Sequence, residues 1–221
     1  MIRMDRISKN IAIRLTNELS LTEENRDIVE YGAFILVQTI FSVIIVVLIS
    51  IPFKVTQEVI ILTITTSVLR KYSGGVHASS PGICTFIGTL ICMSQALVIK
   101  YFLMPQITLQ FIICISIIIF IWAYYFIFKL APVDSQSKPI KKVEKRKRLK
   151  KISFSILNIY LSLTILSYLG YYFTLNKNLL IYSWCIILGV LWQVFTLTNL
   201  GHIAVGKVDR FFSYLIALKY K

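Results

Sequence analysis

The chain alternates between long apolar runs and shorter polar, often basic, segments. Runs of about 18 or more apolar residues with few charges are typical of transmembrane helices. Four runs fit this description plainly, a fifth holds one charge, Lys100, near its end, and a sixth is shorter and rich in Thr. The pattern predicts an all-α integral membrane protein with six transmembrane helices, the second short and open to a tilted, shallow or re-entrant placement. In chain order the predicted spans are Tyr31–Ile51, Val55–Leu69, Ile83–Leu103, Ile107–Leu130, Ile152–Phe173 and Leu179–Leu200.

The composition strengthens this interpretation. Hydrophobic residues make up 57% of the chain, charged residues make up 15%, and the mean hydropathy is +0.74. A soluble domain typically carries about 25% charged residues. Residues 1–221 are therefore interpreted as a single polytopic membrane domain.

The distribution of Lys and Arg predicts the orientation. If six helices cross the membrane, three of the 24 basic residues, Lys54, Lys100 and Lys177, fall on one side and the other 21 fall on the opposite side. Cytoplasmic segments carry the excess of Lys and Arg. Both termini are therefore expected in the cytoplasm, and an arrangement with five spans would break this partition.

Two of the predicted cytoplasmic segments are unusual. Residues 1–30 place apolar positions at helical spacing among charges, which predicts an interfacial amphipathic helix rather than a signal peptide. Residues 129–151 are expected to form a loop with a dense basic run. This run is interpreted as a topology anchor that attracts anionic lipids, with an electrostatic guide for an acidic peptide as the second interpretation. Nucleic acid is not expected as a partner, because the basic residues flank membrane spans.

The polar residues exclude several classes of membrane protein. No carboxylate lies deep in a predicted span, and Glu58 is at a span edge. Aspartyl proteases and proton-coupled transporters of membranes place such groups inside helices. His77 and His202 lack the Glu and second His of a zinc-protease motif, so no metal site is predicted. Polar residues within spans, such as Asn158 and Gln193, are expected to hydrogen-bond between helices or protomers.

One dense polar stretch, residues 70–84, lies between the second and third predicted spans on the cytoplasmic side. It contains two adjacent glycines, His77 and Cys84. On one continuous helix His77 and Cys84 would lie roughly 10 Å apart along the axis, too far for a hydrogen bond. Ser80 followed by Pro81 predicts that a helix begins between them. This break would let His77 fold back towards Cys84.

Such a fold would suit a cysteine nucleophile. In the first turn of a helix Cys84 would lie at the positive end of the helix dipole, which favours a thiolate, and an adjacent imidazole could move its proton. Free N–H groups of that turn, or those of Gly74 and Gly75, could hold an oxyanion. From spacing alone, a packing role for Cys84 and a solvated His77 remain equally open. No residue is singled out to orient His77.

Two motifs in the chain carry a family resemblance. The first comprises Arg70, Gly74-Gly75-Val76-His77-Ala78 and Cys84, and the second comprises Ala131-Pro132-Val133-Asp134 followed by Lys138-Pro139-Ile140. In this order they resemble the accessory gene regulator B (AgrB) family, membrane cysteine endopeptidases of Gram-positive bacteria that process quorum-sensing propeptides. Length, span count and loop placement are similar over nearly the whole chain. The resemblance implies that Cys84 is the nucleophile and His77 its base.

The resemblance also implies a substrate and partners. An AgrD-like propeptide would bind at the cytoplasmic face of the bacterial cell membrane, form a thioester with Cys84, and then cyclise to a thiolactone or lactone. Arg70, and to a lesser degree Lys71, would position an acidic segment of the propeptide, although both also suit a role as basic anchors. A homodimer in contact with membrane lipids is expected, and no cofactor. A non-catalytic peptide exporter or permease, a membrane sensor and a scaffold are the alternatives.

Overall fold

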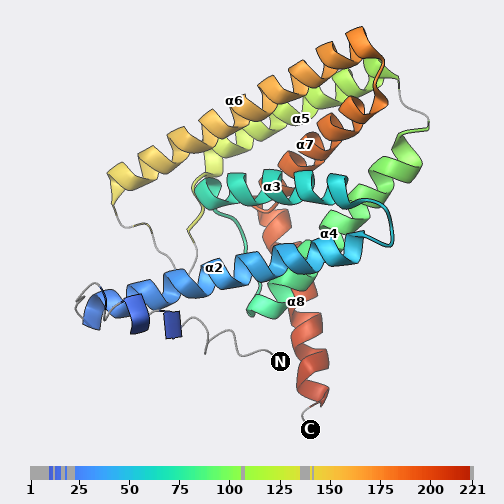
Figure 1. Ribbon diagram of the computed structural model, residues 1–221. Helices are drawn as coiled ribbons and strands as arrows, with labels where there is room; N and C mark the ends of the chain where they lie inside the picture. Colours follow the sequence, from blue (N-terminus) through green and yellow to red (C-terminus); the bar gives the residue numbers. More distant parts are fainter. Residues whose placement is uncertain are drawn as a thin grey trace. The chain divides into compact units, whose positions relative to one another are not determined.

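The computed structural model describes residues 10, 11, 13–15, 18, 23–105, 108–134, 140 and 142–219, and these contain helices and no strand. The all-α prediction is thereby confirmed for this part of the chain (Figure 1). The amphipathic helix expected in residues 1–30 lies mostly outside the described residues, as do Lys138-Pro139 of the second motif. The elements are α2 (Glu23–Ser50), α3 (Thr56–Ser73), α4 (Pro81–Leu97), the π-helix η1 (Val98–Leu103), α5 (Leu109–Leu130), α6 (Val143–Thr174), α7 (Lys177–Phe195) and α8 (Asn199–Lys219).

The described helices include five that are long and apolar enough to cross a membrane. These segments are Gly32–Ser50, Pro81–Leu103, Leu109–Leu130, Val143–Thr174 and Lys177–Phe195. The second predicted span is present as the 18-residue helix α3, but it is not one of the five. Its Thr residues and the basic pair Arg70 and Lys71 in its last turn lower its hydropathy. A six-span arrangement therefore stays a prediction.

The chain divides into two compact units, Met1–Ile49 and Ser50–Lys221. The first unit contains nearly all of α2, the helix expected from the first apolar run. The second unit contains every other named element and all of the candidate site residues.

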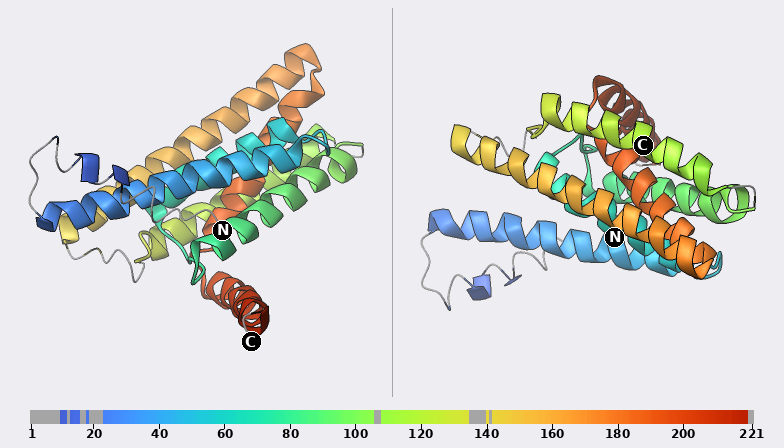
Figure 2. Two further views of the ribbon diagram at one scale, coloured as in Figure 1. Left: turned by 60° about the horizontal axis from the view of Figure 1, so that its bottom comes forward. Right: turned by 90° about the horizontal axis from the view of Figure 1, so that it is seen from above.

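Helix α7 is the centre of the second unit. It packs against α3, α5 and α6, and α5 and α6 lie side by side (Figures 1 and 2). Its residues 183–187 are all buried, which is typical of a helix enclosed on every side. Gly189 of α7 lets α3 approach closely, because an added Cβ would lie 2.9 Å from the Thr65 methyl group.

Polar contacts collect at the two ends of this bundle. At one end, Lys100 forms an ion pair with the buried Glu58 at 3.1 Å and also donates to the Lys54 carbonyl oxygen. At the other end, Ser73 accepts hydrogen bonds from residues that follow α5 and from α7. Lys54 and Lys100 therefore lie together at the end of the bundle opposite Ser73.

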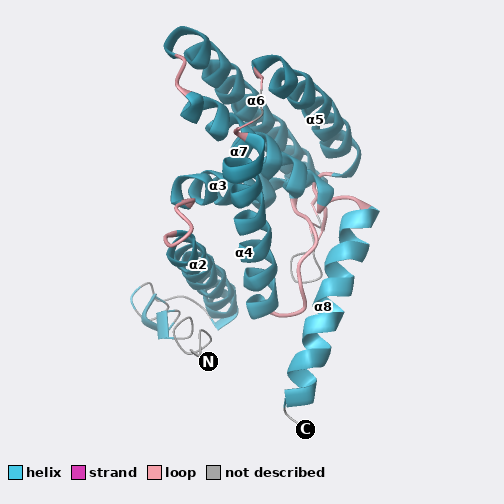
Figure 3. Ribbon diagram, turned by 90° about the vertical axis from the view of Figure 1, so that its right-hand side faces the viewer, coloured by secondary structure: helices cyan, strands magenta, loops and turns pink. Residues whose placement is uncertain are grey.

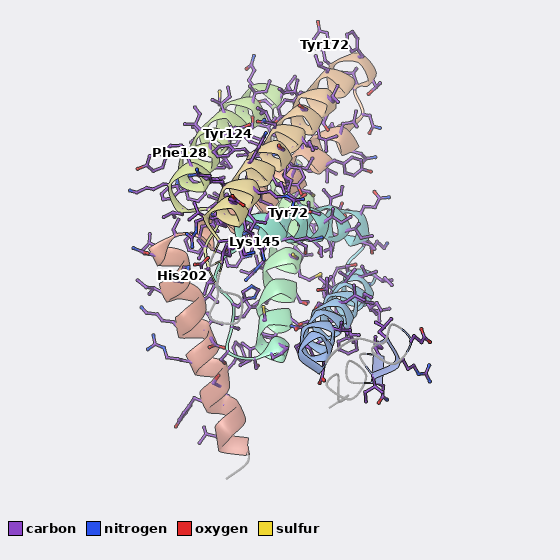
Figure 4. All side chains as sticks on the ribbon, turned by 90° about the vertical axis from the view of Figure 1, so that its left-hand side faces the viewer. Tyr72, Tyr124, Phe128, Lys145, Tyr172 and His202 are labelled. Atoms are coloured by element: carbon purple, nitrogen blue, oxygen red, sulfur yellow. The ribbon has the colours of Figure 1, made fainter. Side chains whose placement is uncertain are left out.

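Two predicted boundaries are wrong. The basic run was expected in a loop before Ile152, but α6 begins at Val143, because Lys, Arg and Leu are good helix formers. Lys145 accordingly lies near one end of α6 and Tyr172 near the other (Figure 4). The last span was expected to reach Leu200, but α7 ends at Phe195.

Short side chains explain why α7 ends early. The hydroxyls of Thr196 and Thr198 donate to the carbonyls of Gln193 and Phe195, at 2.7 and 2.8 Å. Gly201 permits the tight turn between α7 and α8, since a Cβ there would lie 2.1 Å from the Phe195 carbonyl oxygen. The chain then continues as α8, whose C-terminal end projects beyond the other helices of this unit (Figure 3). His202 lies at the beginning of α8 and is exposed (Figure 4).

Candidate active site

The polar stretch 70–84 begins with a glycine turn that ends α3. Gly74 has φ 74° and ψ −154°, and Gly75 has φ 136°, conformations that residues with a Cβ rarely adopt. The Gly74 N–H donates to the Arg70 carbonyl at 3.0 Å and closes the helix. Because that N–H is already engaged, Gly74 serves as a turn residue in this conformation rather than as an oxyanion donor.

The next helix begins where the sequence predicts. Ser80 is the N-cap of α4 in an extended conformation, its hydroxyl accepts from the Ile83 N–H at 3.3 Å, and Pro81 opens the helix. The Cys84 N–H donates to the Ser80 carbonyl at 3.0 Å. Of the first-turn amides, this leaves the Gly82 N–H without an acceptor among the described residues. Among the expected oxyanion donors, the Gly75 and Gly82 N–H groups therefore have no acceptor among the described residues, whereas the Gly74 N–H is engaged.

His77 and Cys84 meet across this break. The Cys84 Sγ atom lies 4.0 Å from the His77 Nδ1 atom, at the outer limit for a hydrogen bond to sulfur. Cys84 is half-buried and His77 is exposed. Catalytic hydrogen bonds are often long in the absence of substrate, so this separation is compatible with proton transfer once a peptide is bound.

The surroundings of His77 keep its imidazole neutral. Although His77 is exposed, desolvation by the surrounding protein and, to a lesser degree, the nearby Arg70 cation together lower its pKa to about 4. At neutral pH the ring can therefore accept a proton. The pair is best described as a thiol beside a neutral base.

Arg70 lies at the centre of this stretch. Its guanidinium donates to the Val76 carbonyl and so ties the end of α3 to the loop that carries His77. The buried Nε atom has no partner among the described residues. Lys71 is placed differently, since it is exposed and its Nζ atom lies 5.5 Å from the centre of the Tyr72 ring.

The second motif lies against the first. The Val133 N–H donates to the Ser73 carbonyl at 2.9 Å, and the Val133 carbonyl oxygen occupies the space that a Cβ of Gly74 would fill. Asp134, which follows, forms an ion pair with Arg146 of α6 at 2.5 Å. The structure therefore brings the two motifs together around the glycine turn.

Helix α7 supplies contacts that the sequence only partly revealed. Gln193 donates from Nε2 to the Gly74 carbonyl at 2.8 Å and to the Ser73 hydroxyl at 3.1 Å. The Val76 N–H donates to the Thr196 carbonyl at 3.2 Å. The expectation that Gln193 bonds between helices is confirmed, and so is that for Asn158, which accepts a hydrogen bond from the Tyr124 hydroxyl. What the sequence did not reveal is that Gln193 holds the glycine turn at Gly74.

Comparison with known proteins decides the family. The sequence profile described as Accessory gene regulator B matches residues 8–197. The chain belongs to this family. "Putative AgrB-like protein" of Clostridium perfringens (strain SM101 / Type A) is 39% identical over 216 residues, 96% of this chain and 100% of that protein. "Putative AgrB-like protein 2" of Clostridium perfringens (strain 13 / Type A) is 38% identical over the same shares of both chains.

A more distant relative and the structural search complete this comparison. "Putative AgrB-like protein" of Clostridium acetobutylicum is 23% identical over 163 residues, 74% of this chain and 75% of that protein. No solved structure gives a significant match. The family assignment confirms the resemblance seen in the sequence motifs, and the five long apolar helices fit a multi-pass membrane protein of the AgrB family.

Proposed function

We propose that this AgrB-family chain is a membrane cysteine endopeptidase that cleaves an AgrD-like quorum-sensing propeptide. The observation that carries the proposal is the 4.0 Å approach of Cys84 Sγ to a neutral His77 at the beginning of an apolar helix. A half-buried thiol at a helix start beside a base is the arrangement that activated cysteine nucleophiles need. Family membership supports a role in processing signalling peptides.

In the proposed reaction, His77 takes the thiol proton as Cys84 Sγ attacks the carbonyl carbon of one internal peptide bond. The Gly82 N–H is the first-turn donor that remains to bind the developing oxyanion. The C–N bond then breaks, the leaving amine takes the proton from His77, and the C-terminal fragment departs. The N-terminal part remains on Cys84 as a thioester.

The second half of the reaction closes the ring. A Cys thiol or Ser hydroxyl within the bound peptide attacks the thioester carbonyl, forms a thiolactone or lactone, and returns the thiol of Cys84. Exchange of one thioester for another is nearly balanced, so it succeeds only where water is kept out and the two groups are held close. Departure of the C-terminal fragment favours the forward direction of the overall reaction.

The proposed placement in the membrane follows the charge pattern. Six spans, with α3 as the second, put both termini, the glycine turn and the site in the cytoplasm, and put Lys54, Lys100 and Lys177 outside. In α6 the basic residues from Lys145 to Lys151 are exposed apart from a half-buried Lys150, and they suit anionic lipids or an acidic propeptide segment. A homodimer in the membrane is part of the same proposal.

Mass spectrometry of a candidate propeptide co-expressed with the protein tests this function. The wild type should yield the cleaved C-terminal fragment, the cyclic product and an acyl adduct on Cys84. Cys84→Ala should abolish all three, and Cys84→Ser should turn over far less, because a hydroxyl is a weaker nucleophile. The matched control is Cys92→Ala in the same helix, which should process normally because Cys92 is a buried packing residue. Normal processing by Cys84→Ala would favour the alternative of a non-catalytic exporter.

A further inference from the structure

The C-terminal helix α8 lies beyond the part of the chain that the family profile matches. The profile ends at residue 197, and α8 begins at Asn199. Nevertheless α8 contacts the loop and the helix that carry the candidate catalytic pair, through one polar contact and one apolar contact.

The polar contact is made by Asp209. One of its carboxylate oxygens accepts from the Ser79 backbone N–H at 3.0 Å and from the Ser79 hydroxyl at 2.9 Å. Because the Ser79 hydroxyl proton is used in this bond, the hydroxyl can only accept from Ser213, which lies 3.4 Å away. Ser79 is thus fixed at both its backbone and its side chain, two residues after His77.

The apolar contact is made one turn to either side of Asp209. Val205 is buried in a cluster with Ile83 and Ile87 of α4, and Phe212 packs against the same cluster. The Phe212 ring also meets the Phe86 ring edge-on, with ring centres 4.7 Å apart. These residues of α4 flank Cys84 in sequence and on the same helix.

We propose that α8 holds His77 and Cys84 in register, with Asp209 as the positioning residue. Helix α8 grips the loop with His77 through Ser79 and grips the helix with Cys84 through the apolar cluster. The positions of His77 and Cys84 relative to each other therefore both depend on contacts with the same helix, α8. This inference rests on the proposed function, because it assigns Asp209 a role in that reaction and not in a separate one.

The geometry of the pair makes it sensitive to this support. The 4.0 Å distance between Cys84 Sγ and His77 Nδ1 is already at the limit for a hydrogen bond to sulfur, so a further displacement of His77 would break the contact. Before His77, the loop is held by the bonds of Val76 to Arg70 and Thr196, and after it by the bonds of Ser79 to Asp209, which precede the α4 cap at Ser80. Without Asp209, no side-chain hydrogen bond from another helix holds the stretch between His77 and that cap. A misplacement of about 1 Å costs up to about 100-fold in rate.

The test measures two rates on the full-length chain in membranes. The first is the alkylation of Cys84 by iodoacetamide across a pH series, followed by mass spectrometry of the peptide that contains it, with His77→Ala as the reference. The second is propeptide processing. Asp209→Ala should move the pH profile of alkylation towards that of His77→Ala and slow processing by about 10- to 100-fold. Asp209→Asn should recover part of both rates, because its amide oxygen can still accept from Ser79.

The control and a second variant keep the test decisive. Lys207→Ala removes an exposed charge from the same helix and should leave both rates unchanged. Ser79→Ala removes the hydroxyl bond but keeps the backbone bond, so it should give an intermediate loss, and it decides the matter if Asp209→Ala does not accumulate. A wild-type pH profile and processing rate in Asp209→Ala, or in Ser79→Ala, would overturn the proposal.

The two measurements separate this proposal from the proposed function. If alkylation of Cys84 depends on His77 and Asp209 but no propeptide is cleaved, positioning by Asp209 stands and the peptidase assignment fails. If the propeptide is cleaved through Cys84 while Asp209→Ala is indistinguishable from the wild type, the peptidase stands and the role of α8 is refuted.

Discussion

Substituting Gly74 with Ala tests whether the glycine turn controls the site. Gly74 has φ 74° and ψ −154°, which falls in a region that is essentially restricted to glycine. An added Cβ would lie 2.1 Å from the Val133 carbonyl oxygen, about 1 Å nearer than real Cβ contacts allow. The obstacle is backbone, so rotation of a side chain cannot relieve it.

The cost follows from these two effects. The backbone conformation alone costs about 1–3 kcal/mol for a residue with a Cβ. Moving the Val133 peptide also weakens its 2.9 Å hydrogen bond to the Ser73 carbonyl, which adds about 0.5–1.5 kcal/mol. We therefore expect Gly74→Ala to lower the free energy of unfolding by roughly 2–4 kcal/mol, a large part of the 5–15 kcal/mol of a typical domain.

The assay combines thermal melting of the detergent-solubilised protein with propeptide processing. A loss of this size lowers the Tm by about 5–15 °C for a chain of this length. Because the turn leads directly to the loop with His77, processing should fall even at temperatures where the variant remains folded. Gly88→Ala is the matched control, since nothing lies within 4 Å of its added Cβ, and it should melt no lower than the wild type. A Gly74→Ala variant that matches the wild type in both Tm and processing would refute this reasoning.

Three further outcomes are expected. Arg70→Lys keeps the charge but loses the planar guanidinium that can bind a carboxylate with two hydrogen bonds, so it should lose most propeptide processing while the protein still inserts. Lys71→Ala should lose less. Normal processing by Arg70→Lys would mean that Arg70 serves only as a basic anchor at the membrane surface. The acid limb of the processing rate should lie well below pH 6.5, because the pKa of His77 is lowered to about 4. Between pH 6.5 and about 4 the unfolded chain binds a proton at His77 more readily than the folded chain does, so the stability should decline as the pH falls through this range. A melting temperature that stays constant over this range would contradict the lowered pKa of His77. A membrane-impermeant maleimide applied to intact cells should label a cysteine introduced at Lys54 and not one introduced at Lys71; labelling at Lys71 would place the site outside.

Local signals allowed the sequence to predict the core of the site. Ser80 and Pro81 define a helix start through interactions within a few residues, so the break between His77 and Cys84 could be read without knowledge of the fold. The apolar runs likewise predict membrane helices, because length and hydropathy are local properties of the sequence. The break permits, but does not by itself require, the 4.0 Å approach of Cys84 to His77 that the structure shows.

Long-range partners could not be predicted in the same way. The contacts of Gln193 with Ser73 and of Asp209 with Ser79 join residues 120 and 130 positions apart. A single polar residue in or after an apolar helix indicates that it needs a partner, but not which one. The start of α6 was missed for another reason: a basic run reads equally well as a loop or as helix, and the choice depends on what surrounds it.

The anchoring of the glycine turn on α7 has a consequence for biosynthesis. The turn lies in the first half of the chain, yet Ser73 and Gly74 receive their hydrogen bonds from Gln193, and Val76 donates to Thr196. While the chain is being made, the segment with Cys84 leaves the ribosome long before these partners exist. The loop from Gly74 to Ser80 can take its final form only after the last apolar helix has joined the others. An incomplete chain therefore presents Cys84 beside a loop that is not yet organised, and any activity of this site depends on completed assembly.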